Sequence, residues 1–255
     1  MEIKTPSLEV LFAPAEFAAL DGWDLSRTTC VVFDVLRATT SMVTALANGA
    51  SAIIPAAEIP ESLVLQARNP GSLLAGERDG LRIRAELTGG VDFDLGNSPR
   101  EFTREKVAGK SIVMTTTNGT RALRACAGAK AVLVSALVNL EATARHISER
   151  QPEHLLLVCG GTFEQMAYED ILAAGALCDS VWPHYCGGAV ADSALVAREI
   201  FVSEKADLFA ALSRSRNGRR LIARPELSED VRWCARCNAF PLVARLQADG
   251  RVIAS

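Results

Sequence analysis

The sequence predicts a layered α/β/α fold with a largely parallel or mixed sheet, as a single domain over residues 1–255 or as two closely packed lobes. Two observations support this prediction. Short apolar runs rich in β-branched residues alternate with stretches of helical periodicity, a pattern typical of strands covered by helices. In addition, 49% of the 255 residues are hydrophobic, so the chain can bury a large core.

Six short apolar runs are expected to be interior strands. The helix after the first run is indicated by apolar spacing from Met42 to Ala47 and ends at Asn48-Gly49. A second helix is predicted to begin at Ser98, where a capping-box pattern includes a proline. From about residue 190 the pattern is mainly helical, with a closing hairpin around Asp249-Gly250. The predicted strands are residues 29–33, 52–54, 73–75, 111–115, 131–135 and 155–159.

Composition excludes several classes of partner. The net charge is −3 and only 5% of residues are aromatic, so we expect no nucleic-acid partner. No apolar run is long enough for a membrane span and no secretory signal is evident, so we expect no membrane partner and a cytoplasmic location. Seven scattered cysteines suit reduced thiols better than disulfides. The oligomeric state stays open, a homo-oligomer included.

The polar residues that follow predicted strands are the first candidates for a site, because ligands bind beyond the carboxyl ends of strands in open α/β sheets. After the first strand, Asp34 can ligate Mg²⁺ and Arg37 can contact phosphate oxygens. The alternative is that Asp34 or Thr39 only caps the next helix. The other clusters of this kind are residues 76–78, 96–99, 115–120 and 159–162.

Residues 115–120 combine threonine hydroxyls, a glycine and a predicted helix start, which suits a phosphate cradle. An ordinary β–α turn is the alternative, and the lysine of a P-loop is absent, so nucleotide binding has no support. A Mg²⁺ site needs carboxylates from separate segments. We therefore expect the metal ligands to come from the set Asp34, Glu77, Glu169 and Asp170.

Two phosphatase mechanisms with a covalent nucleophile find little support. A Cys-x₅-Arg nucleophile at Cys159 would need arginine where Gln165 stands, and a haloacid-dehalogenase-type aspartate at Asp34 would need a second aspartate where Leu36 stands. We therefore expect metal-activated water as the nucleophile, with a phosphoenzyme on Asp34 as the alternative. The Cys234-x-x-Cys237 pair has zinc-knuckle spacing but lacks a second ligand pair.

Five segments in order resemble the 2-phosphosulfolactate phosphatase family: FDVLRATTS, AGERDG, FDLGNSP, GKSIVMTTTNGT and YEDILAAGAL, within residues 31–180. The resemblance implies an α/β fold and a Mg²⁺-dependent phosphatase. Such an enzyme releases phosphate from 2-phospho-3-sulfolactate, a small anionic phosphate ester, in coenzyme M biosynthesis. The C-terminal segments 215–218 and 229–230 resemble the family more loosely. A phosphatase of another small phosphorylated hydroxy acid and a non-catalytic protein that binds an anionic metabolite remain alternatives.

The resemblance also implies roles for individual residues. Asp34, Arg37 and Asp170 are expected to be catalytic, with Asp34 or Asp170 orienting water. The carboxylates of Asp34, Glu77, Glu169 and Asp170 would bind Mg²⁺. Arginines and turn amides would bind the phosphate and the sulfonate or carboxylate of the substrate. The expected substrate-binding residues are Arg37, Arg78, Asn97, Ser98, Thr116, Thr117, Asn118, Gly119 and Thr120.

Overall fold

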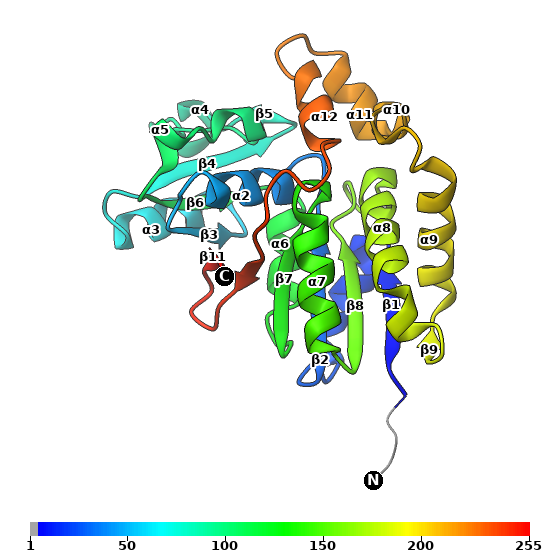
Figure 1. The fold of residues 1–255 in the computed structure, drawn as a ribbon. Coiled ribbons are helices and arrows are strands. Elements are labelled where there is room, and N and C mark those ends of the chain that lie inside the picture. The colour runs from blue at the N-terminus through cyan, green and yellow to red at the C-terminus, as the bar shows by residue number, and fades with distance from the viewer. Residues whose placement is uncertain (1–4) are drawn as a thin grey trace.

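The computed structural model describes residues 5–255, in which a mixed sheet of 11 strands is covered by helices (Figure 1). The order of the strands across the sheet is β5-β4-β6-β3-β11-β10-β7-β2-β8-β1-β9. This architecture confirms the predicted α/β class with a mixed sheet. The strands are β1 (Ser7–Leu11), β2 (Thr28–Phe33), β3 (Ala52–Ala56), β4 (Leu73–Arg78), β5 (Leu81–Arg82), β6 (Ser111–Thr115), β7 (Ala131–Ser135), β8 (His154–Cys159), β9 (Ala189–Val190), β10 (Ala244–Leu246) and β11 (Val252–Ala254).

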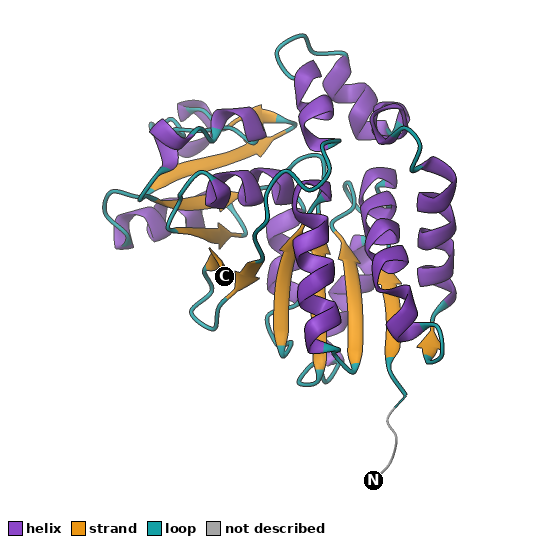
Figure 2. Cartoon of the chain, in the orientation of Figure 1, coloured by secondary structure: helices purple, strands orange, loops and turns teal. Residues whose placement is uncertain are grey.

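The sheet consists of two parallel blocks joined by an antiparallel hairpin. Strands β7, β2, β8, β1 and β9 form one block, and β4, β6 and β3 form the other. The hairpin β10–β11 bridges them, since β10 pairs with β7 and β11 pairs with β3. In Figures 1 and 2 the arrowheads of β4, β7 and β8 all point toward helices α11 and α12. The carboxyl ends of strands from both blocks therefore face one region.

Helices cover both faces of the β7-β2-β8-β1 block. Because side chains alternate along a strand, Val31 and Phe33 of β2 pack in a core cluster with residues of α7 and α8. The intervening Cys30 and Val32 pack in a second cluster with residues of α2 and α6. A smaller cluster joins β3, β4 and β6 to α3. The three layers expected from the sequence are thus present.

The C-terminal helices α10, α11 and α12 form a cap over the carboxyl ends of the strands, drawn in orange in Figure 1. Their apolar side chains, such as Leu212, Leu221 and Val231, belong to the same core cluster as α8. The α-helices are α1 (Pro14–Ala18), α2 (Ala38–Ala47), α3 (Ile59–Arg68), α4 (Ala85–Thr88), α5 (Arg104–Val107), α6 (Gly119–Ala125), α7 (Leu140–Arg150), α8 (Tyr168–Tyr185), α9 (Asp192–Glu204), α10 (Leu208–Arg214), α11 (Arg216–Ile222) and α12 (Ser228–Cys234), and the 3₁₀ turns are η1 (Ala19–Gly22), η2 (Pro99–Glu101) and η3 (Leu137–Asn139).

Most predicted elements are confirmed. All six predicted strands are present, helix α2 ends at Asn48-Gly49, and the closing hairpin turns at Asp249-Gly250. The helix predicted at Ser98 is wrong, because only the single 3₁₀ turn η2 forms there. The Ser98 hydroxyl donates to Asp230 instead of capping the turn, and the Glu101 carboxylate accepts from the backbone N–H of Gly96.

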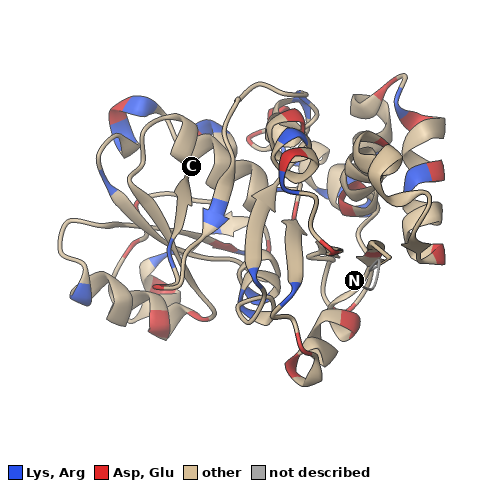
Figure 3. Ribbon diagram, turned by 60° about the horizontal axis from the view of Figure 1, so that its bottom comes forward, with Lys and Arg blue, Asp and Glu red and all other residues tan. Residues whose placement is uncertain are grey.

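Within residues 5–255 no helix is both long enough and apolar enough to cross a bilayer. All seven cysteines are free, and five of them are buried. Charged residues of both signs are interspersed over the helices and loops (Figure 3).

Candidate active site

A cavity of about 220 Å³ lies where the carboxyl ends of both sheet blocks meet the cap. It is lined by loops that follow β2, β4, β6 and β8, and by side chains of α11. Its position agrees with the rule that α/β proteins bind ligands beyond the carboxyl ends of their strands. The charged residues that line it are Asp34, Glu77, Asp79, Arg37, Arg78, Arg220 and Arg224.

Asp34 directly follows β2 and lies in a close-fitting slot. Its Oδ1 accepts a hydrogen bond of 3.2 Å from the backbone N–H of Ala38 at the start of α2. A Cβ atom added to Gly119 would lie 2.8 Å from Asp34 Oδ2, and one added to Gly160 would lie 3.1 Å from Asp34 Cβ. Asp34 thus makes the capping contact that was the alternative reading, and it lines the cavity as well.

The pKa of Asp34 is raised from its ordinary value of 3.8 to about 7. Burial is the main cause, and the charges of Glu77 and Glu169 raise the pKa further. Hydrogen bonds from the backbone N–H groups of Ala38 and Gly119 act in the opposite direction. A carboxyl group perturbed in this way and facing a cavity is typical of a functional site.

Glu77, at the end of β4, also lines the cavity. Its Oε2 accepts from the backbone N–H of Gly80 at 2.7 Å. Its Oε1 accepts from the backbone N–H and the hydroxyl of Thr117, at 3.0 and 2.9 Å. The Glu77 carboxylate therefore joins the turn after β4 to the loop after β6.

Glu169 and Asp170 lie in the first turn of α8 and are almost fully buried. The two Asp170 carboxylate oxygens accept backbone N–H groups, one from Val35 at 2.8 Å and one from Gly161 at 3.0 Å. Glu169 Oε1 accepts from Asn217 Nδ2 at 2.6 Å. Neither residue is among those that line the cavity. Burial raises the pKa of both carboxyl groups, and for Asp170 the neighbouring Asp34 and Glu169 add to the effect.

The four predicted metal ligands occupy one neighbourhood but play different parts in it. Asp34 and Glu77 line the cavity, whereas Glu169 and Asp170 do not, and all four accept hydrogen bonds from the protein. Among the described residues, no group of three or more His, Cys, Asp and Glu side chains is arranged as ligands of one ion.

The oxygen donors of the cavity nevertheless suit Mg²⁺, which takes one or two carboxylates together with neutral oxygens and waters. The amide oxygens of Asn97 and Asn118 are buried, and no described residue donates to them. Both residues line the cavity beside Asp34 and Glu77. Buried acceptors normally have a partner, so these oxygens are available to a cation or to its water ligands.

Both of the predicted arginines, Arg37 and Arg78, line the cavity. Arg37 donates to Asp230 at 2.6 Å and to the carbonyl oxygen of Gly80 at 2.7 Å. Arg78 donates to the carbonyl oxygen of Glu77 at 2.7 Å and forms an ion pair of 3.5 Å with the exposed Glu58.

The predicted phosphate cradle is only partly exposed to the cavity. Thr117 and Asn118 line it, and Gly119 packs against Asp34. The hydroxyls of Thr116 and Thr120 are buried and bond within their own turn. Ser98 is buried as well, and its hydroxyl donates to Asp230. It is not among the residues that line the cavity.

The cap contributes cavity residues to which the sequence assigned no role. Arg220 and Arg224 line the cavity, as does Asn217. The Arg220 guanidinium carbon lies 5.7 Å from the centre of the Phe163 ring, and Arg224 donates to the carbonyl oxygen of Asp79 at 3.0 Å. The spacing of four between Arg216 and Arg220 is the signal that was available for the helix, since residues four apart share a helix face, and Arg224 follows the end of α11.

The environment of Cys159 agrees with the weak support for a cysteine nucleophile. It is fully buried at the end of β8, and burial together with the charge of Asp170 raises the pKa of its thiol well above the ordinary value. A protonated, buried thiol is a poor nucleophile.

Comparison with known proteins agrees with the resemblance. A family model described as 2-phosphosulpholactate phosphatase matches residues 18–249. A probable 2-phosphosulfolactate phosphatase from Caldanaerobacter subterraneus subsp. tengcongensis is 35% identical over 235 residues, or 91% of this chain and 92% of the relative. Relatives with the same name from Thermotoga petrophila and Gloeobacter violaceus are each 37% identical, over 86% and 88% of this chain and 88% and 90% of the relatives. The chain therefore belongs to the 2-phosphosulfolactate phosphatase family, and it is a phosphoric monoester hydrolase.

Proposed function

We propose that the chain is a Mg²⁺-dependent phosphatase that hydrolyses 2-phospho-3-sulfolactate to 3-sulfolactate and phosphate, a step of coenzyme M biosynthesis. The observation that carries this proposal is the cavity, which Arg37, Arg78, Arg220 and Arg224 line together with the carboxyl group of Asp34. The proposed substrate has a phosphate, a sulfonate and a carboxylate. Guanidinium groups bind such oxyanions through paired hydrogen bonds. The substrate itself is taken from the names of the relatives.

The size of the cavity favours a small substrate. Its volume of about 220 Å³ is below the range of roughly 300–1,000 Å³ found for pockets that bind drug-sized ligands. Seven charged side chains line it, but only three large apolar ones, Leu36, Phe163 and Leu221. A short, highly charged ester suits both properties.

Asp34 is the residue that we assign to orienting the attacking water. Of the two aspartates considered for this role, Asp34 lines the cavity and Asp170 does not, and both oxygens of Asp170 accept backbone N–H groups. Asp170 instead fixes the loops after β2 and β8 on which Asp34 and Gly161 lie. A positioned carboxylate that accepts a hydrogen bond from water aligns it for attack on phosphorus.

Arg37 is assigned to the phosphoryl group. In phosphoryl transfer the protein contributes mainly by positioning and by stabilising charge on the transferring oxygens, which a fixed guanidinium does well. Asp34 and Glu77, with the amide oxygens of Asn97 and Asn118, are the residues that would hold Mg²⁺. When bound, Mg²⁺ would offset the negative charge of the phosphate oxygens.

The test is phosphate release from 2-phospho-3-sulfolactate by the parent chain and by Asp34→Asn, with Mg²⁺ or with EDTA. We expect release only by the parent with Mg²⁺. Asp24→Asn is the matched control, because Asp24 is exposed in a loop away from the cavity, and it should retain full activity. A thermal unfolding scan provides a second readout, since a cation that binds the folded state raises the melting temperature of the parent but not of Asp34→Asn.

Each part of the proposal has its own contrary result. Full activity of Asp34→Asn would overturn the assignment of Asp34. Turnover in EDTA would overturn the metal requirement. Hydrolysis of other phosphorylated hydroxy acids, but not of 2-phospho-3-sulfolactate, would replace the substrate and retain the reaction.

A further inference from the structure

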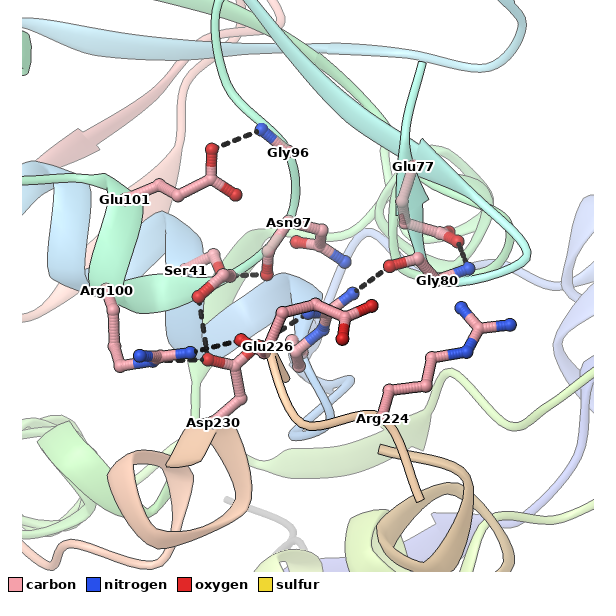
Figure 4. A network of polar contacts seen from close by, with 12 residues as sticks. Ser41, Glu77, Gly80, Gly96, Asn97, Arg100, Glu101, Arg224, Glu226 and Asp230 are labelled. Atoms are coloured by element: carbon pink, nitrogen blue, oxygen red, sulfur yellow. Dashed lines mark hydrogen bonds and ion pairs between the residues drawn. The ribbon is translucent and has the colours of Figure 1, made fainter. Parts of the chain in front are cut away.

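Asp230 of α12 is a fully buried carboxylate at the junction of the cap and the active site. Its Oδ2 accepts from Arg37 at 2.6 Å, and its Oδ1 accepts from the Ser98 hydroxyl at 2.7 Å. Oδ1 also accepts from Arg100 Nε at 2.7 Å (Figure 4). One side chain from the cap therefore holds two segments that are far apart in sequence, the loop after β2 and the loop before η2.

Arg37 is fixed on two sides by this arrangement. One terminal nitrogen donates to Asp230, and the other donates to the carbonyl oxygen of Gly80. The N–H of Gly80 in turn donates to Glu77, so Gly80 links Arg37 to the acidic side of the cavity. Arg37 is only 3% exposed, yet it lines the cavity. Bonds to described residues use two of its five N–H donors, which leaves three for a ligand.

Stability alone is a weak explanation for such a pair. Removing two charges from water costs much of what their attraction gains, so apolar residues of similar size often stabilise a fold equally well. An arginine that is fixed before the ligand arrives, by contrast, has already lost the rotamer freedom that binding would otherwise cost. The place of the ion pair, at the wall of the cavity, fits this second explanation.

We propose that Asp230 is a positioning residue, which holds Arg37 in the orientation in which its free N–H groups meet the phosphate group of the ligand. The proposal rests on the proposed function only in that the ligand carries a phosphate. The rival explanation is that Asp230 merely fastens the cap to the rest of the fold. The two explanations differ in whether the effect of Asp230 on ligand affinity depends on Arg37.

The test is a double-mutant cycle on the binding of inorganic phosphate, measured by calorimetry with the parent, Asp230→Asn, Arg37→Ala and the double variant. Asparagine keeps the volume of Asp230 and one acceptor, so it is the gentlest change that removes the charge. We expect Asp230→Asn to weaken phosphate binding by about ten-fold, and to weaken it no further once Arg37 is absent. Losses that add in the double variant, or unchanged binding in Asp230→Asn, would overturn the proposal.

Asp179→Asn is the matched control. Asp179 lies on α8 and accepts a hydrogen bond of 2.9 Å from Nε of Arg198 on α9. Neither residue lines the cavity, so the affinity for phosphate should not change. Hydrolysis assays add a second readout, because Asp230→Asn should alter kcat and KM while the melting temperature shows the fold intact. The parent chain could fail to hydrolyse 2-phospho-3-sulfolactate while the effects of the two substitutions on phosphate binding are non-additive. That result would overturn the proposed substrate but leave the role of Asp230 standing.

Discussion

Asp170 accepts a hydrogen bond of 2.8 Å from the backbone N–H of Val35, the residue that follows Asp34. Its second oxygen accepts from the backbone N–H of Gly161, which follows β8. The Asp170 carboxylate thus joins the segments that follow two neighbouring parallel strands, β2 and β8. By fixing Val35, Asp170 helps to hold Asp34 between Gly119 and Gly160, in addition to the hydrogen bond that Asp34 accepts from Ala38.

Replacing Asp170 by alanine should therefore destabilise the fold. Two buried N–H groups lose their acceptor, and we expect the free energy of unfolding to fall by about 2 kcal/mol or more. Urea unfolding of Asp170→Ala and of the control Asp179→Ala, on the same helix, measures the difference. The control loses a partly exposed ion pair, which contributes about 1 kcal/mol or less. Equal losses in the two variants would contradict the role assigned to Asp170.

The strands could be predicted from sequence because they are buried on both faces. Their runs of valine, leucine and isoleucine are long enough to recognise without knowledge of any partner. Strand β1 was missed, since Glu9 interrupts its five residues and leaves little apolar signal. The failed helix at Ser98 has a tertiary cause, because the serine hydroxyl bonds to Asp230, which is 132 residues away.

For the candidate site, too, local sequence predicted some features, whereas others depend on contacts between distant segments. Residues that follow strands, such as Asp34 and Glu77, were found because the fold class fixes where strands end. The orientation of each side chain could not be predicted from the sequence, because it depends on partners in other segments. Glu169 bonds to Asn217 of α11, and Arg220 reaches the cavity only because the cap folds back over the sheet. The spacing of arginines in α11 was visible in the sequence, but the partners of these side chains were not.

A methyl group at position 119 should disable the site without unfolding the protein. In Gly119→Ala the new Cβ would lie 2.8 Å from both Asp34 Oδ2 and Ala38 Cβ, so the carboxylate must move. Such displacements of a catalytic group lower kcat/KM by about ten- to a hundred-fold. Gly128→Ala is the control, because nothing lies within 4 Å of its added Cβ. Phosphate-release assays on both variants decide the question, and equal activities would show that Asp34 tolerates the crowding.

The metal-free protein should lose stability as the pH rises from 5 to 7. The pKa of Asp34 is about 7 in the folded chain and ordinarily 3.8, so in this window the folded state holds a proton that the unfolded state has released. The free energy of unfolding then falls by about 1.4 kcal/mol per pH unit for Asp34 alone. Burial raises the pKa of Glu169 and Asp170 as well, so their contributions have the same sign.

Urea unfolding in EDTA at several pH values measures this slope. Asp34→Asn should flatten it, and the comparison with the parent cancels the contribution of groups such as His146, whose pKa is lowered by burial. A parent protein whose stability is constant or rises between pH 5 and 7 would show that the buried carboxyl groups are not protonated in the folded state.

Arg220 should govern the choice between substrates. It is exposed at the mouth of the cavity, whereas Arg37 is buried at its wall. In a ligand whose phosphate meets Arg37, the sulfonate or carboxylate is the group left to face the cap. Arg220→Ala should therefore lower kcat/KM for 2-phospho-3-sulfolactate by about ten-fold, but hardly change it for a phosphate monoester without a second acid group. Arg219→Ala removes a neighbouring exposed arginine that does not line the cavity, and it should leave both rates unchanged. Equal losses on both substrates in Arg220→Ala would instead place Arg220 at the phosphate.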